Sequence, residues 1–414
     1  MKIATCLVEV DTQEARSSEV EALGASWARF GEQVLFFAEN SEWADVLGGA
    51  ERSGLLLKEH PYDVPKENLH LVVQKGRLFQ QEYPDVPVLL DKGRFLVVDL
   101  SPELANTFNR GDEPCYTIRP LSENMVAFKV RPKTAARRNP VAWIQNLVAQ
   151  VSRSSLEANL AHLVSWSTRY STSNSYSQAS DWAKQQLEIM DYDTRLETIA
   201  VGSSTSQNVI VEQPGNHSGT RELVLVIAHL DSINEDGPNE IAPGADDNGS
   251  GSAGLLEIAR VLKTHQNKHD LRFILVGGEE QGLFGSKQYV ASLPTTERAR
   301  IKAVLNMDMI GTVNNATPTV LLEGAPISQS LIDGLAEAAE TYTGLTVQTS
   351  LHPYNSDHVP FIDVGIPAVL TIEGSDGANS NIHSAGDTLS HISYDLMLEI
   401  LRMNIAFIAN TVGQ

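Results

Sequence analysis

The feature that most constrains this chain is an alternation of strand-like and helix-like segments after Pro140. Short apolar runs, typical of buried strands, alternate with longer segments whose apolar residues recur at helical spacing. This alternation predicts a layered α/β domain, with helices on both faces of a mostly parallel sheet. The predicted strands are 207–211, 223–228, 271–276, 303–307, 319–322 and 368–370, and the predicted helices are 141–151, 156–170, 179–190, 249–265, 285–293, 328–343 and 394–410.

The first 130 residues have a different pattern, in which short apolar runs recur between turn residues. They predict a smaller β-rich N-terminal domain over 1–130, with strands at 3–10, 34–37, 55–57, 69–73, 94–98 and 125–130. The segment 131–140 is rich in basic residues and proline, and it predicts an exposed linker. Because a protease could cleave such a linker, the N-terminal part is either an accessory domain or a pro-region. The α/β domain is then 141–414.

Composition narrows the classes of partner. Of the 414 residues, 42% are hydrophobic and 20% are charged, as in an ordinary soluble protein. The net charge of -21 repels phosphate backbones, so we expect no nucleic-acid partner. We also expect no membrane span, because no run reaches the roughly 18 apolar residues that a span needs. The oligomeric state is not readable from the sequence.

Two further observations concern cysteines and targeting. Cys6 and Cys115 are the only cysteines, which excludes a cysteine-based zinc cluster. One disulfide and two free thiols are equally consistent with this count. Residues 1–10 do not have the pattern of a secretion signal, since Glu9 interrupts a short apolar run.

Polar groups that can bind metals follow the predicted strands of the second domain. Because ligands bind beyond the carboxyl ends of strands in open α/β sheets, such groups mark a candidate site. An acidic pair before a glycine-rich helix start and a histidine in a late loop add further donors. The candidate residues are His229, Asp231, Asp246, Glu279, Glu280, Asp308 and His383.

Each candidate is a weak signal alone, since an aspartate before a helix can simply be a cap. Together, two imidazoles and three carboxylates suit two zinc ions that share one carboxylate. Three carboxylates and a bridging hydroxide would balance the charge of two divalent cations. Glu279 is then an additional carboxylate that is free to take a proton from water. Asp231 is placed to accept the second ring proton of His229.

The motifs around these residues resemble peptidase family M28, a family of zinc aminopeptidases. The resemblance covers about residues 140–414 and leaves out the first 130. It implies a zinc exopeptidase-like fold with three αβα layers and a mostly parallel, mixed central sheet. The motifs are Val226–Asp231, Ala242–Gly251, Glu279–Ser286, Asn306–Asp308, Ser356–His358 and Ile382–His383.

The resemblance implies a role for each metal ligand and two zinc ions per chain. His229 and Asp308 would hold one zinc ion. Glu280 and His383 would hold the other. Asp246 would bridge the two ions. In this family the peptide bond after the bridging aspartate is cis, so we expect a cis bond between Asp246 and Asp247.

The resemblance also implies the reaction, which is hydrolysis of the N-terminal residue from a peptide. Glu279 would act as general base and acid on a water molecule that bridges the metals, with Asp231 supporting His229. Tyr354 would lie near the substrate carbonyl. Relatives with additional domains are usually exported, so a secreted or periplasmic location is expected.

Three other functions compete with this one. Glutaminyl cyclases resemble the family but are acyl transferases that use one zinc ion. A carboxypeptidase or dipeptidase would need a basic pocket, and no arginine adjoins the motifs. A binding domain without catalysis should have lost a ligand or the base, and none is missing. The loop 374–381 lacks the aromatic residues of leucine-preferring members, which leaves the side-chain preference open.

Overall fold

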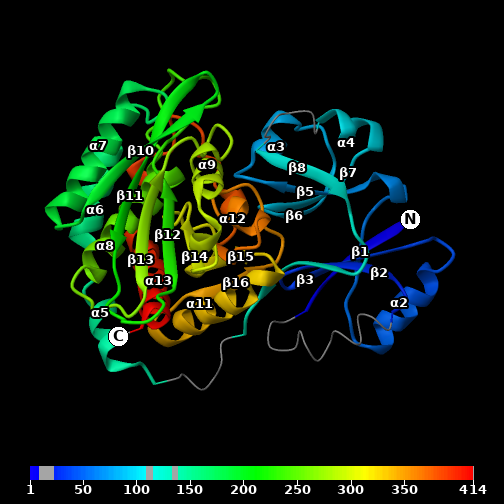
Figure 1. The fold of residues 1–414 in the computed structure, drawn as a ribbon. Helices are drawn as coiled ribbons and strands as arrows, with labels where there is room; N and C mark the ends of the chain where they lie inside the picture. The colour runs from blue at the N-terminus through cyan, green and yellow to red at the C-terminus, as the bar shows by residue number, and fades with distance from the viewer. Residues whose placement is uncertain (9–22, 109–114, 133–138, 414) are drawn as a thin grey trace. The chain divides into compact units, whose positions relative to one another are not determined.

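The computed structural model describes residues 1–8, 23–108, 115–132 and 139–413. The chain forms two compact units (Figure 1). The N-terminal unit comprises Met1–Lys133, Gln348–Ser350 and Ser375–Ser380, and the C-terminal unit comprises the rest. Most of the predicted linker 131–140 lies outside the described residues.

The C-terminal unit is built on a mixed sheet. Its four central strands, β13, β12, β14 and β17, are parallel, whereas β11 and β15 pair with this group in antiparallel fashion. The predicted fold class is therefore confirmed. In spatial order the strands are β10 (Thr194–Val201), β11 (Ser204–Gln213), β13 (Asp270–Val276), β12 (Leu223–His229), β14 (Ile301–Met307), β17 (Ala368–Glu373), β15 (Thr319–Gly324) and β16 (Thr346–Ser350).

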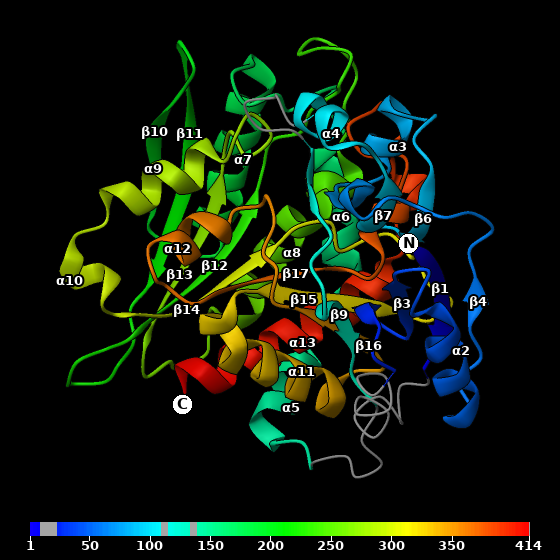
Figure 2. The same cartoon turned by 90° about the vertical axis from the view of Figure 1, so that its right-hand side faces the viewer.

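Helices cover both faces of this sheet because alternate side chains of each strand point to opposite faces. In β12, Val226 joins one buried cluster and Ile227 joins another. Figure 2 shows helices on either side of the strands. The larger cluster involves α5 (Ala142–Val148), α6 (Arg153–Leu163), α7 (Asn174–Ile189), α8 (Gly251–Leu262), α11 (Gln329–Tyr342) and α13 (Tyr394–Val412), and the smaller one involves α9 (Phe284–Ser292) and α12 (Val359–Asp363).

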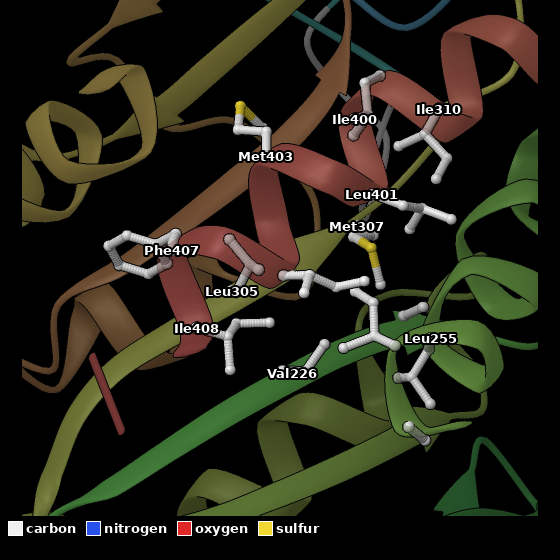
Figure 3. Close-up of a cluster of buried hydrophobic side chains, with 14 of the residues drawn as sticks. Val226, Leu255, Leu305, Met307, Ile310, Ile400, Leu401, Met403, Phe407 and Ile408 are labelled. Atoms are coloured by element: carbon white, nitrogen blue, oxygen red, sulfur yellow. The ribbon is translucent and has the colours of Figure 1, made fainter. Parts of the chain in front are cut away.

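The helix α13 contributes most to the packing shown in Figure 3. Ser393 caps its start by accepting a hydrogen bond from the Leu396 amide. Ile408 and Leu401 lie in the same buried cluster as Leu305 of β14. Burying a side chain of this size stabilises the fold by about 1.5–3 kcal/mol relative to exposing it. None of the helices in the described residues has the length and apolar character needed to cross a lipid bilayer.

Among the described residues, the strands of the N-terminal unit lie in two sheets, each packed against at least one helix. The first has the strand order β9 (Met125–Val130), β2 (Ser26–Phe30), β3 (Gln33–Ala38), β1 (Lys2–Leu7) and β4 (Lys58–Glu59), and it packs on α2 (Trp43–Arg52). The second has the order β6 (Val88–Lys92), β7 (Phe95–Asp99), β5 (Leu69–Gln74) and β8 (Tyr116–Pro120), and it packs on α3 (Leu78–Glu82) and α4 (Pro102–Phe108). The unit is β-rich, as predicted, but the sequence interpretation missed its helices.

Two short segments from the C-terminal half of the chain belong to the N-terminal unit, which the sequence did not predict. Gln348 pairs with Val130 in the register of β16 and β9. In the segment Ser375–Ser380, Asp376 accepts a bond of 2.8 Å from the Arg94 guanidinium, and both side chains are buried. Cys6 and Cys115 are not joined by a disulfide bond in this structure.

Candidate active site

The ends of three neighbouring parallel strands supply most of the candidate residues. The strand β12 ends at His229, β13 is followed by Glu279 and Glu280, and β14 is followed by Asp308. Because these strands are adjacent and parallel, their carboxyl ends meet at one edge of the sheet. One ligand atom from each of His229, Glu279 and Glu280 lies within 4.8 Å of the others.

The centre of the site is the carboxylate of Asp247, which lies between two histidines. Its Oδ1 is 3.2 Å from Nε2 of His229, and its Oδ2 is 3.2 Å from Nε2 of His383. His229 Nε2 is also 3.2 Å from Asp308 Oδ1, and His383 Nε2 is 3.0 Å from Glu280 Oε2. Two groups of three donors therefore share one carboxylate.

The shared carboxylate is one residue later than the sequence interpretation placed it. Asp246 does not join either donor group. Its Oδ1 instead accepts a 2.8 Å bond from the Gly311 amide, and its carboxyl group also bonds to Thr312 and Glu373. The cis peptide bond is likewise Asp247–Asn248, not Asp246–Asp247. Two adjacent aspartates look alike in sequence, and only the turn that carries them decides which side chain faces the histidines.

That turn depends on Gly244, which precedes the segment Ala245–Ser250. Gly244 has a φ of 54°, in the left-handed region that favours glycine. A Cβ atom there would lie 2.5 Å from the carbonyl oxygen of Asp247 and 2.5 Å from Cβ of Ser232. A side chain at this position would therefore push against the backbone of the shared ligand.

Neighbouring groups orient the other donors. Ser356 donates a 2.8 Å hydrogen bond to Oδ2 of Asp308, which leaves Oδ1 toward His229. His383 has a φ of 54°, a conformation that costs a non-glycine residue free energy and clusters at functional sites. Glu235 lies beside His383, with Oε1 at 3.5 Å from Nδ1.

Asp231 lies beside His229, but it contacts the ring differently from the sequence prediction. Nδ1 of His229 is 3.2 Å from the carbonyl oxygen of Asp231, and its distance to the carboxylate is 3.7 Å. The carboxylate accepts hydrogen bonds from the backbone amides of Glu279 and Glu280, at 3.4 and 3.3 Å. Asp231 thus orients His229 through its main chain and holds the turn of both glutamates through its side chain.

The site concentrates negative charge in the interior. Burial raises the pKa of Asp231 to about 7, with further contributions from Glu280 and Asp357. Burial alone would lower the pKa of His229, but the surrounding carboxylates, with Glu279 and Asp308 foremost, raise it well above its usual value. Burial would raise the pKa of Asp247, but both histidines hold it well below its usual range. These shifts arise because buried carboxylates surround the two histidines, and such a cluster attracts cations.

The donor set fits metal ions. Both carboxylate oxygens of Asp247 and Oε1 of Glu280 are buried, and apart from the two imidazoles beside Asp247 no donor among the described residues bonds to them. Ligands about 2.0–2.1 Å from a tetrahedral zinc ion lie about 3.3 Å apart. The imidazole–carboxylate distances of 3.0 to 3.2 Å are close to that spacing.

Several residues beside the site had no signal in the sequence. Arg169 is fully buried, and Asp387 is 2% exposed. Both contact the backbone next to Asp247. A lone arginine or aspartate in a loop has no spacing that would have revealed it.

The predicted residue Tyr354 is buried, and its amide donates a 3.0 Å bond to Glu323. His358, the last residue of the motif Ser356–His358, is buried, and its Nε2 lies 3.6 Å from Oε1 of the same glutamate.

This fold and this donor set define a metallopeptidase, and comparisons with known proteins identify its family. The model of peptidase family M28 matches residues 208–408. Leucine aminopeptidase 1 of Coccidioides posadasii is 33% identical over 281 residues, which are 63% of this chain and 71% of that protein. The chain belongs to peptidase family M28, and it is a metallo-aminopeptidase of the hydrolase class.

Solved structures share the fold. LapB from Legionella pneumophila has a TM-score of 0.61 at 21% identity, and the match covers 84% of this chain and all of that one (100%). Glutaminyl cyclase from Porphyromonas gingivalis has a TM-score of 0.52 at 20% identity, with 64% and 99% covered. At these identities the similarity establishes the fold alone.

Proposed function

We propose that this chain is a di-zinc aminopeptidase that removes N-terminal residues from peptides. His229 and Asp308 would hold one zinc ion, Glu280 and His383 the other, and Asp247 would bridge both. The observation that carries this proposal is the shared carboxylate, with one oxygen 3.2 Å from each histidine. Asp247 thus replaces Asp246 as the bridging ligand.

Bound zinc ions would lower the pKa of a water molecule and polarise the scissile carbonyl. Glu279 is the group that would move the proton, from the attacking water to the leaving amine. Its side chain is buried beside His229 and Glu280. The carboxylate of Asp231 would keep Glu279 in place through the backbone amide.

The substrate would be a peptide or protein with a free N-terminus. The name of the Coccidioides relative, leucine aminopeptidase, supports an aminopeptidase direction and an apolar first residue. Tyr354 is proposed to contact the substrate carbonyl. Rates across a series of N-terminal residues, on blocked and unblocked peptides, would test both points, since hydrolysis of the blocked series would exclude an aminopeptidase.

The catalytic proposal is tested by Glu279→Gln. This variant keeps the shape of the side chain but cannot take a proton. We expect kcat on aminoacyl nitroanilides to fall by about 100- to 10,000-fold, with zinc content unchanged. The matched control is Glu257→Gln, a buried carboxylate of α8 that bonds to the Ser152 amide outside the site. Turnover by Glu279→Gln equal to that of the control would contradict the mechanism.

The second candidate is a glutaminyl cyclase, because such an enzyme shares the fold. A one-zinc enzyme needs only one of the two donor groups, whereas this chain has both. Counting zinc per chain and assaying cyclisation of N-terminal glutamine would separate the two functions. One zinc ion with cyclisation, and without release of amino acids, would favour the cyclase.

We further infer that the N-terminal unit is a permanent accessory domain and not a removable pro-region. The support is that two segments of the C-terminal half, Gln348–Ser350 and Ser375–Ser380, are part of this unit. Cleavage near residue 133 would then leave the two pieces associated, as size-exclusion chromatography would show. Release of a separate N-terminal fragment would indicate a pro-region. A secreted or periplasmic location is also proposed, and cell fractionation would test it.

A further inference from the structure

The main chain that carries Asp247 is held by two buried side chains of opposite charge. Arg169 lies in the loop between α6 and α7, and Asp387 lies in the loop after His383. Arg169 is 0% exposed and Asp387 is 2% exposed. Neither is a donor in the two metal-binding groups, so the proposed chemistry does not use them directly.

Among the described residues, the guanidinium of Arg169 donates hydrogen bonds to backbone carbonyl oxygens only. Two of these carbonyls directly precede the turn of Asp247. Nη1 donates to Pro243 at 2.5 Å, and Nη2 donates to Gly244 at 2.9 Å. Nε donates to the carbonyl of Leu230 at 2.8 Å, which ties the same guanidinium to the segment after His229.

Asp387 binds the amides that follow those carbonyls. Its Oδ1 accepts from the Asp246 amide at 2.9 Å, and its Oδ2 accepts from the Asp247 amide at 2.9 Å. Its own carbonyl accepts from the Ala245 amide at 3.2 Å. One residue therefore satisfies three consecutive backbone donors, and its carboxylate makes charge-assisted bonds with two of them.

We propose that Arg169 and Asp387 are positioning residues that clamp the backbone of Pro243–Asp247 and so set where the shared carboxylate lies. The guanidinium of Arg169 holds the carbonyls at the start of the segment, and Asp387 holds the amides that follow them. Because Asp387 follows His383 by four residues, it also links the loop of that histidine to the shared ligand. The clamp rests on the proposed function, since it acts through the bridging role of Asp247.

The geometry assigns different contributions to the two residues. Asp387 accepts a hydrogen bond from the amide of Asp247 itself, and it lies only four residues after His383 in the chain. Its loss should therefore weaken the group formed by Asp247, Glu280 and His383 in particular. Arg169 does not contact Asp247. It binds the carbonyl of Gly244, before the turn, and it also binds the segment that follows His229, so it connects these two segments. Its loss should disturb both groups more evenly.

The test measures zinc binding by the full-length protein in competition with a chromophoric chelator. In Asp387→Asn, one of the two accepting oxygens is replaced by an NH2 group. That group is a donor, so it cannot accept the hydrogen bond of the backbone amide opposite it, and this bond is lost. We expect zinc affinity to fall by about 10- to 100-fold, the effect typical of removing partners of metal ligands. Arg169→Lys keeps the charge but loses the planar fork that reaches several carbonyls, and it should weaken binding similarly.

Glu257→Gln is the matched control, because it also removes the charge of a buried carboxylate that holds a backbone amide. The absorption spectrum of the cobalt-substituted protein adds a readout of site geometry that general destabilisation does not change. We expect altered spectra for the Asp387 and Arg169 variants and an unchanged spectrum for the control. If either variant fails to fold, the other carries the same test.

Two failures are distinguishable. Wild-type protein that binds no zinc would overturn the proposed function, and the clamp with it. Wild-type protein with two zinc ions, together with clamp variants whose zinc affinity and cobalt spectra match the control, would overturn only the clamp.

Discussion

The two units of this chain bury charge in opposite ways. In the N-terminal unit, Arg94 and Asp376 form a buried ion pair at 2.8 Å, so each charge has its partner within the protein. In the C-terminal unit, several carboxylates gather around two histidines at the strand ends, and apart from those imidazoles the oxygens of Asp247 have no hydrogen-bond donor in the described residues. Since an unbalanced buried charge is costly, it indicates a partner from outside the chain.

The largest effect is expected from a substitution at the centre of the carboxylate cluster. Asp247→Asn removes the anion that both metal ions would share. We expect zinc content to fall below two per chain and kcat/KM to fall by more than about 1,000-fold, through loss of the shared metal site. Zinc analysis after dialysis and a nitroanilide assay would measure both quantities.

Asp246→Asn is the control for that variant. An asparagine there can still accept from the Gly311 amide and donate to Glu373, so the local bonds survive. We expect two zinc ions and a change in activity of less than about tenfold. Loss of zinc in Asp246→Asn, with retention in Asp247→Asn, would restore the assignment made from sequence alone.

A smaller effect is expected from breaking the balanced pair. Arg94→Met leaves Asp376 buried without its cation, which should lower the free energy of unfolding by about 3–5 kcal/mol. Replacing both residues by apolar ones should recover most of that loss, because no charge is then left unpaired. Urea denaturation of the single and double variants would measure this. Equal stability of wild type and Arg94→Met would show that the pair does not stabilise the unit.

The contrast between the units also explains how well each was predicted. The central strands of the C-terminal unit are continuous apolar runs such as Leu223–Ala228, because both faces of the sheet are covered. In the N-terminal unit the same rule failed at 55–57, which is not a strand. Leu56 there is 90% exposed, so three adjacent leucines did not mark a buried element.

The sequence predicted residues that gather at the site, but it did not predict all of their contacts. Strand ends in a parallel sheet converge, so His229, Glu280 and Asp308 could be grouped from the order of the elements. The choice between Asp246 and Asp247 depends on the path of a single turn, which no spacing rule specifies. The contact of Asp387 with this turn joins residues far apart in sequence, and it depends on the loop after His383.

The most direct test of the central claim is a crystal structure with anomalous diffraction recorded at the zinc edge. The account predicts two anomalous peaks on either side of the Asp247 carboxylate, one beside His229 and Asp308 and the other beside Glu280 and His383. A single peak, or two peaks flanking Asp246, would contradict it.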